Sequence, residues 1–261
     1  MKAVITLKNN IYEVNFNAPI DISLPSNVKD SFTAWYVNPI SINPVMTEDF
    51  IGSVKQGGAV NFCDMHINPH GNTTHTECVG HISKEKERVN DVVKKFHFLS
   101  QVISVSPRKI ESNKSNWQRK GDYIIDKEAI EKVLIPGVEA VVLRTQKDYM
   151  SLFNKQYNNT NWPYLVPEAA SFLRISGVKH LLIDQPSIDR EKDGGQLLAH
   201  KSFWDYPQKT DLLRTITEFI AVPEKANDGI YLLNLSIANF SNDASPSRPI
   251  LFKLIKQNNI S

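Results

Sequence analysis

The sequence NPHGNTTHTECVGH, residues 68–81, decides how this chain is interpreted. It contains His70, His75 and His81, which are three of the seven histidines in the chain, together with Glu77. Imidazole and carboxylate groups are the usual protein ligands of zinc, manganese and similar ions. The segment therefore predicts a metal site. The alternative is a polar loop whose histidines cap backbone groups.

The spacing of His75 and Glu77 indicates how both could reach one ion. In an extended strand, residues i and i+2 point to the same face, whereas in a helix they diverge by about 200°. The β-branched threonines beside them favour a strand. Gly71-Asn72 predicts a turn that brings His70 back over the same face. His66 lies too early in the chain to join them, and we expect it to have a structural or ligand-supporting role.

The composition excludes several classes of protein. The 261 residues carry 30 basic and 28 acidic side chains and have no long basic run, so nucleic-acid binding is not indicated. No apolar run approaches the roughly 20 residues that span a bilayer, and the N-terminus lacks a signal-peptide pattern. Cys63 and Cys78 do not form a disulfide framework. We expect both to be buried, unpaired thiols of a cytoplasmic protein, with a soft metal ligand as the alternative.

Alternating β-rich and helical segments predict a single α/β domain over residues 1–261, without internal repeats or linkers. Asp126 is expected to cap a helix that ends before Pro136-Gly137, and Pro167 to begin a helix that ends before Gly177. The apolar spacing after Asp211 predicts another helix, which would carry Glu218. Strands are expected at residues 3–7, 11–16, 20–24, 140–145, 178–183, 229–235 and 249–254.

His200 and Glu218 form a second candidate pair. A half-buried Glu218 would need a partner or a metal ion. Alternatively, Glu218 is a surface residue that pairs with Arg214 four positions earlier on the same helix. The residues alone leave these two interpretations open.

Taken in order, these motifs resemble the cyclase-type metal hydrolases, which include bacterial kynurenine formamidase and isatin hydrolase. That family carries a His-x-Gly-Thr-His-x-Asp-x-Pro-x-His signature, then a strand leading into Asp-x-Pro-Ser-x-Asp, then Ala-His, then a helix-borne Glu or Gln. The resemblance covers about residues 18–255. The matching segments are residues 20–25, 74–81, 183–189 and 199–200, followed by Glu218.

The chain departs from the family pattern at four places. His70 and His75 are five positions apart instead of four, and a bulge at Gly71-Asn72 would absorb the extra residue. Glu77 replaces the usual aspartate, and Val79 replaces the proline. The longer interval between His200 and Glu218 suggests an inserted loop with Phe203, Trp204 and Tyr206. These departures bear on the substrate more than on the fold.

The resemblance implies a swivelling β/β/α fold and a centre of one or two divalent ions, zinc or manganese. Its implied ligands are His70, His75, Glu77, His200 and Glu218, and it implies that His81 is the catalytic acid-base group. The implied reaction is hydrolysis of an amide, lactam or related carbonyl bond in a small molecule, with chemistry like that of an arylformamidase. The family also implies a homo-oligomer.

Competing classes use the same scaffold differently. The chain could be a non-hydrolytic cyclase or lyase, a metal-binding protein without turnover because of Glu77, or a small-molecule-binding protein without metal. Phe62, Trp35 and Trp204 are candidates for an apolar pocket wall, and each could equally be ordinary core or interface.

Overall fold

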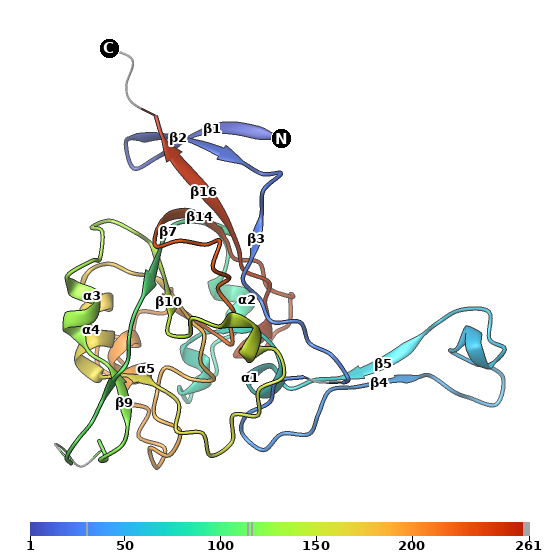
Figure 1. Cartoon of the computed structure of the whole chain (residues 1–261). Coiled ribbons are helices and arrows are strands. Elements are labelled where there is room, and N and C mark those ends of the chain that lie inside the picture. The colour runs from blue at the N-terminus through green and yellow to red at the C-terminus, as the bar shows by residue number, and fades with distance from the viewer. Residues whose placement is uncertain (30, 114, 116, 258–261) are drawn as a thin grey trace.

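The computed structural model describes residues 1–257 apart from residues 30, 114 and 116. Its centre is a large mixed β-sheet, with three helices packed against one face (Figure 1). These helices are α3 (Lys127–Glu131), α4 (Pro167–Ile175) and α5 (Leu198–Trp204). None of the described helices is long and apolar enough to cross a bilayer.

Four neighbouring strands of the large sheet run parallel, so their carboxyl ends meet at one edge. They are β7 (His97–Ser104), β10 (Ala140–Arg144), β12 (His180–Ile183) and β13 (Thr215–Glu218). Beyond β13 follow two antiparallel strands, β6 (His75–Glu77) and β15 (Ala244–Pro246). Beyond β7 lie β14 (Gly229–Asn234), β16 (Ile250–Lys256), β2 (Asn10–Asn15) and β1 (Lys2–Leu7), and β3 (Ile20–Asp21) pairs with β16.

The core lies on both faces of the parallel strands. In β10, Val141 and Leu143 belong to the apolar cluster that includes the three helices, while Ala140 and Val142 belong to the cluster on the other face. Strands that are buried on both sides read as continuous apolar runs. The layered arrangement therefore explains why residues 140–143 are all apolar.

Smaller elements surround the sheet. The helices α1 (Pro69–Asn72) and α2 (Val89–Val92) each make about one turn. A small sheet contains β11 (Tyr164–Leu165), β9 (Tyr123–Ile125) and β8 (Arg108–Lys109). Three short 3-10 turns lie at Val54–Gln56, Val79–His81 and Tyr149–Leu152.

Several local predictions are confirmed. The strands expected at residues 3–7 and 11–16 form as β1 and β2, which pair as an antiparallel hairpin. The Asp126 side chain accepts a hydrogen bond from the backbone N–H of Ala129 and caps α3. Helix α4 begins at Pro167, and Gly177, two residues past its end, has a positive φ of 88°. The local chemistry of caps and turns thus specified these boundaries.

Other local predictions are wrong. Residues 215–218 form strand β13 instead of a helix, so Glu218 lies on a strand. The apolar residues Leu212, Leu213, Ile216, Phe219 and Ile220 follow a helical spacing, which outweighed the short alternation of Thr215, Ile216 and Thr217. Phe203 and Trp204 are buried on helix α5 and do not lie in an inserted loop. Cys63 is exposed and Cys78 is buried; both are free, as expected.

A long hairpin projects from the body of the molecule (Figure 1). Its strands are β4 (Ser41–Pro44) and β5 (Cys63–His66), and we call residues 41–66 the arm. The arm exposes many large apolar side chains: Ile42, Met46, Phe50, Ile51, Val54, Val60, Phe62 and Met65. Phe62 and His66 therefore lie on the arm. The Phe62 side chain is exposed to solvent, and His66 pairs with Ser41 across the hairpin.

Gly71 in α1 fits a space that admits no larger residue. A Cβ atom at this position would lie 2.5 Å from Val37 Cγ2. We predict that Gly71→Ala lowers the free energy of unfolding by about 1–3 kcal/mol, the usual cost of overpacking, and that the double variant with Val37→Ala recovers most of the loss. Urea denaturation measures both. Equal stabilities for Gly71→Ala and the double variant would contradict the close contact.

Candidate metal centre

Strand pairing places the first three candidate ligands on one face of the sheet. In β6, His75 and Glu77 project to the same side, and their facing atoms His75 Nε2 and Glu77 Oε2 lie 3.9 Å apart. Strand β13 pairs Glu218 directly with His75. His75 Nε2 consequently lies 3.5 Å from Glu218 Oε2. The prediction that His75 and Glu77 lie on one face of a strand is therefore confirmed.

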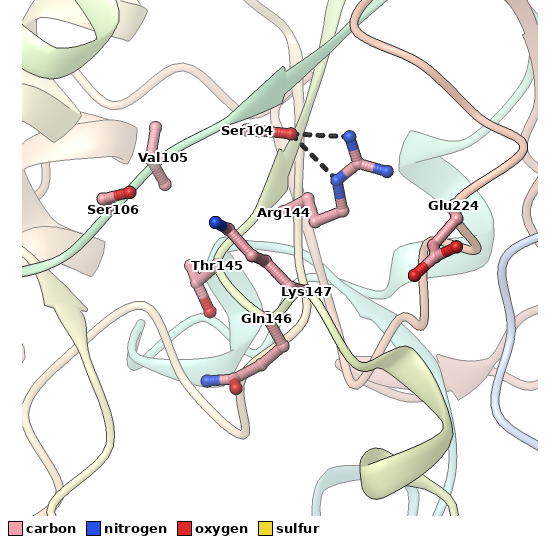
Figure 2. A pocket seen from close by; sticks show the side chains of 8 residues that line it. All are labelled: Ser104, Val105, Ser106, Arg144, Thr145, Gln146, Lys147 and Glu224. Atoms are coloured by element: carbon pink, nitrogen blue, oxygen red, sulfur yellow. Dashed lines mark hydrogen bonds between the residues drawn. The ribbon is translucent and has the colours of Figure 1, made fainter.

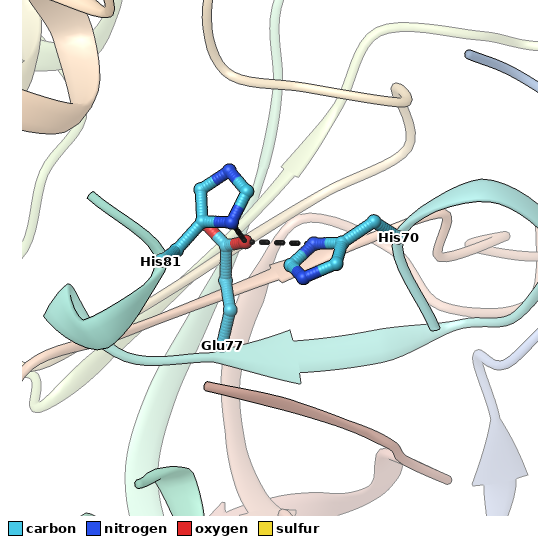
Figure 3. Close-up of side chains that lie close together, drawn as sticks. All are labelled: His70, Glu77 and His81. Carbon is cyan, nitrogen blue, oxygen red and sulfur yellow. Dashed lines mark ion pairs between the residues drawn. The ribbon is translucent and has the colours of Figure 1, made fainter. Parts of the chain in front are cut away.

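His70 and His81 reach Glu77 from the segments that flank β6. His70 lies on α1, and its Nδ1 is 3.2 Å from Glu77 Oε2. His81 lies at the end of the 3-10 turn Val79–His81, and its Nδ1 is 3.8 Å from the same oxygen. Figure 3 shows both rings converging on the Glu77 carboxylate. The turn predicted at Gly71-Asn72 is a helical turn, and it returns His70 over the face as expected.

His200 reaches the centre from helix α5. Its Nε2 lies 2.9 Å from Glu77 Oε1 and 3.8 Å from Glu218 Oε1. Asp189 holds the start of this helix, because its carboxylate accepts hydrogen bonds from the backbone N–H groups of Ala199 and His200. The Glu218 carboxylate is fixed in turn by the backbone N–H of Ile188, at 2.9 Å.

Three of the histidines are oriented by an oxygen acceptor on the ring nitrogen that faces away from Glu77. Thr73 O accepts from His75 Nδ1 at 3.1 Å, Asp189 Oδ2 from His200 Nδ1 at 2.6 Å, and Asp243 Oδ2 from His70 Nε2 at 2.8 Å. Such acceptors fix the tautomer and ring orientation of metal-binding histidines. Each of the three rings therefore presents its other nitrogen to the carboxylates.

The electrostatic environment of the cluster favours an ionised Glu77 and protonated His70 and His200. Burial opposes ionisation of Glu77, but positive charge on His81, hydrogen bonding from His200 and the close approach of His70 outweigh it, so the pKa of Glu77 is well below its usual range. Burial disfavours protonation of His70, yet its neighbours Asp243 and Glu77 raise its pKa to about 10. For the same reason, Asp189 and Glu77 raise the pKa of His200 well above its usual value.

The donor set fits a divalent cation. His75 Nε2 and Glu77 Oε2 are buried and have no hydrogen-bond partner, although they face other donors of the cluster. Buried charges ordinarily need a partner or a metal. Two overlapping sets offer ligand atoms within 4.8 Å of one another: His70, Glu77 and His81, and His75, Glu77 and Glu218. Glu77 belongs to both sets, so the cluster has the composition of a centre for one or two ions.

The structure brings all six predicted site residues together. Arg214 pairs with Asp211, so the surface pairing of Glu218 with Arg214 is wrong. Two carboxylates of the cluster, Asp189 and Asp243, were not predicted as site residues. Asp189 was detectable as the last residue of the Asp-x-Pro-Ser-x-Asp motif, whereas no local pattern marks Asp243, which is 173 positions from its partner His70.

Phe62, Trp35 and Trp204 lie in different surroundings and do not form the predicted pocket wall. Trp204 is fully buried; its ring lies 5.3 Å from that of His200, and its Nε1–H donates to Arg214 O. It therefore packs behind a candidate ligand. Trp35 is partly exposed and packs edge-on against Trp162, with 5.0 Å between ring centroids.

A separate cavity of about 280 Å³ lies at the carboxyl ends of β7 and β10. Figure 2 shows its lining, which includes Ser104, Arg144 and Glu224 but none of the site histidines. The Arg144 guanidinium is engaged by Ser104, Asp228 and two backbone carbonyls. Its hydrogen bonds therefore hold strand ends and loops together.

Comparison with known proteins identifies the family. Residues 20–190 match the model of a family described as "Putative cyclase". The chain therefore belongs to this cyclase family.

Its relatives include two bacterial enzymes. The chain is 29% identical to the kynurenine formamidase of Bacillus cytotoxicus over 234 residues, which cover 89% of this chain and 96% of that protein. It is 25% identical to the kynurenine formamidase of Bacillus anthracis over 237 residues, again 89% of this chain and 96% of that protein.

Solved structures share the fold. Isatin hydrolase A from Labrenzia aggregata superposes with a TM-score of 0.63 at 15% identity, over 90% of this chain and 93% of that chain. A "predicted metal-dependent hydrolase" from Bacillus stearothermophilus gives 0.61 at 14% identity, over 90% and 98%. These similarities confirm the predicted cyclase-type α/β fold class.

We predict that a bound divalent ion stabilises the folded protein. At an ion concentration 100 times the Kd, the gain is about 2.7 kcal/mol, seen as a higher Tm in differential scanning fluorimetry with Zn²⁺ or Mn²⁺. The matched control is His66→Ala, which removes a histidine on the arm and should keep the shift. His75→Ala should lose it, because its Nε2 faces both Glu77 and Glu218. An unaltered shift in His75→Ala would refute the ligand assignment.

Proposed function

We propose that this chain is a metal-dependent hydrolase that cleaves a carbon–nitrogen bond of an amide or lactam in a small molecule. The observation that carries the proposal is the convergence of four histidines on the buried carboxylate of Glu77. The kynurenine formamidase relatives support amide hydrolysis of the arylformamidase type.

The residues proposed to hold the ion are His70, His75, Glu77, His200 and Glu218. A divalent cation bound here would polarise a substrate carbonyl and lower the pKa of a water molecule. Histidine and carboxylate donors suit zinc and manganese alike, and we propose one of these two ions. Glu77 in place of aspartate keeps the carboxylate within reach of all four histidines, which supports retained activity.

The cluster is closed on one side and open on the other. His75, Glu77, His200 and Glu218 are buried, whereas His70 and His81 are partly exposed. A substrate would therefore approach from the side of these two rings. His81 Nδ1 contacts Asp243 at 3.3 Å, which leaves its Nε2 to exchange protons.

His81 is the proposed acid-base group. It accepts a proton from the attacking water as the oxygen bonds to the carbonyl carbon, and returns it to the nitrogen as the carbon–nitrogen bond breaks. A histidine suits this role because its charge changes near neutral pH.

A hydrolysis panel tests the proposed function. N-formyl aromatic amines and cyclic lactams such as isatin are incubated with protein loaded with Zn²⁺ or Mn²⁺, and release of formate or the ring-opened acid is measured. Turnover that is lost with His75→Ala supports the proposal. Loaded protein that cleaves none of them would favour a non-hydrolytic use of the scaffold.

For the acid-base role, we predict that His81→Ala keeps its metal content but cuts kcat on an accepted substrate by about 10²–10⁴-fold, the usual contribution of a positioned acid-base group. Elemental analysis and steady-state kinetics provide the two readouts, with His66→Ala as control. Loss of metal from His81→Ala would make it a ligand, which its place in one of the two donor sets allows. Full metal with full rate would remove it from the mechanism.

We also propose that residues 1–261 form one domain that assembles into a homo-oligomer and works in the cytoplasm, where free thiols such as Cys63 and Cys78 stay reduced. The exposed apolar side chains of the arm support assembly, because large apolar patches on a soluble protein usually mark an interface.

The arm gives this proposal a direct test. We predict that Phe62→Ser with Met65→Ser shifts the protein towards monomer in sedimentation velocity runs. The control is Ile175→Ser on α4, since Ile175 is 75% exposed, at least as much as Phe62 (58%) and Met65 (63%). A monomeric parent protein, or a variant that assembles like the parent, would contradict it.

A further inference from the structure

We propose that Asp243 is a positioning residue that holds His70 for the metal ion and His81 for proton transfer through a single carboxylate oxygen. The inference rests on the proposed function of the centre. It concerns a residue outside the motifs that define the predicted site.

The contacts of Asp243 carry the proposal. Its Oδ2 lies 2.8 Å from His70 Nε2 and 3.3 Å from His81 Nδ1. The two rings lie against each other, with centroids 4.4 Å apart and planes tilted by 31°. One oxygen therefore serves both a candidate ligand and the candidate acid-base group.

The backbone holds Asp243 rigidly in this place. Its carbonyl oxygen accepts from the N–H of Cys78 at 3.0 Å. The next residue, Ala244, pairs directly with Glu77 in the ladder between β15 and β6. On the other side, Asn242 O accepts from the N–H of Val89. The carboxylate is thus fixed relative to the strand that carries His75 and Glu77.

His70 depends on this carboxylate more than the other ligands depend on theirs. His75 and His200 are buried, so packing also restrains their rings, whereas His70 is partly exposed. Without an acceptor on Nε2, the His70 ring could turn Nδ1 away from Glu77. Acceptors of this kind typically contribute 10–100-fold to metal affinity.

Asp243 does not occupy a ligand position itself. It contacts the His70 nitrogen that lies opposite the one facing Glu77. Asp189 has a similar relation to His200, but its other hydrogen bonds described above go to the backbone at the start of α5 and not to the acid-base group. Asp243 differs because it joins the ligand to the acid-base group.

The first test measures Zn²⁺ binding to the full chain by equilibrium dialysis, independently of any substrate. Asp243→Ala should raise the Kd for Zn²⁺ by about 10–100-fold with unchanged stoichiometry. Asp243→Asn keeps one acceptor oxygen without the charge and should fall between Asp243→Ala and the parent. The matched control is Asp205→Ala, since Asp205 has a similar side-chain exposure (26% against 23%) and pairs with Arg174 away from the centre. Its Kd should equal that of the parent.

The second test separates the two roles. In a His81→Ala background, Asp243→Ala should still weaken Zn²⁺ binding by the same factor, because this effect passes through His70. With an accepted substrate and saturating Zn²⁺, Asp243→Ala should lower kcat more than it changes KM, and Asp243→Glu should recover part of the loss.

Some outcomes would overturn the proposal. A Kd within two-fold of the parent, in a variant whose circular dichroism and unfolding midpoint match the parent, removes the positioning role. A reduced Zn²⁺ stoichiometry would make Asp243 a ligand. If the parent protein bound neither Zn²⁺ nor Mn²⁺, the proposed metal centre itself would be wrong. This result differs from one in which only the role of Asp243 fails.

Discussion

The burial of one carboxylate, that of Glu77, is the constraint on which the rest of the site depends. Glu77 lies in β6 between β13 and β15 and is fully buried. An uncompensated buried ion costs several kcal/mol. The chain meets this cost by bringing imidazoles from α1, β6, the turn after β6 and α5 to the same carboxylate. A centre that draws on four segments forms only when all of them have reached their places in the fold.

The sheet explains how these segments meet. The parallel strands β12 and β13 end at the same edge, which places the loop with Asp189 beside Glu218. Strand β6, from the first third of the chain, is inserted beside β13, and β15 from the C-terminal region closes its other side. A strand paired on both sides has little freedom to move, so the candidate ligands on β6 are held by the backbone ladder as well as by their side-chain contacts.

The buried and the solvent-exposed residues of the centre lie on different sides of it. Behind the centre, Trp204 and the α5 core exclude solvent from His200. In front, His70 and His81 face solvent together with Asp243. The arm, which leads directly into α1, carries apolar surface that its own body does not cover. The proposed roles in ion binding, proton transfer and assembly thus fall in different but adjoining parts of the chain.

The sequence by itself indicated the residues of the candidate centre and much of the fold. The His-x-Glu spacing required a strand, and Asp126, Pro167 and Gly177 fixed helix boundaries, because these features act over a few residues. Local patterns misassigned residues 215–218, because the apolar residues between Leu212 and Ile220 have a helical spacing and a four-residue strand is too short to show a clear alternation of its own. Tertiary structure alone decided that Glu218 pairs with His75 across two strands and that Asp243 joins His70 to His81. These contacts link residues more than a hundred positions apart, and their geometry is set by strand register, which no local pattern in the chain records.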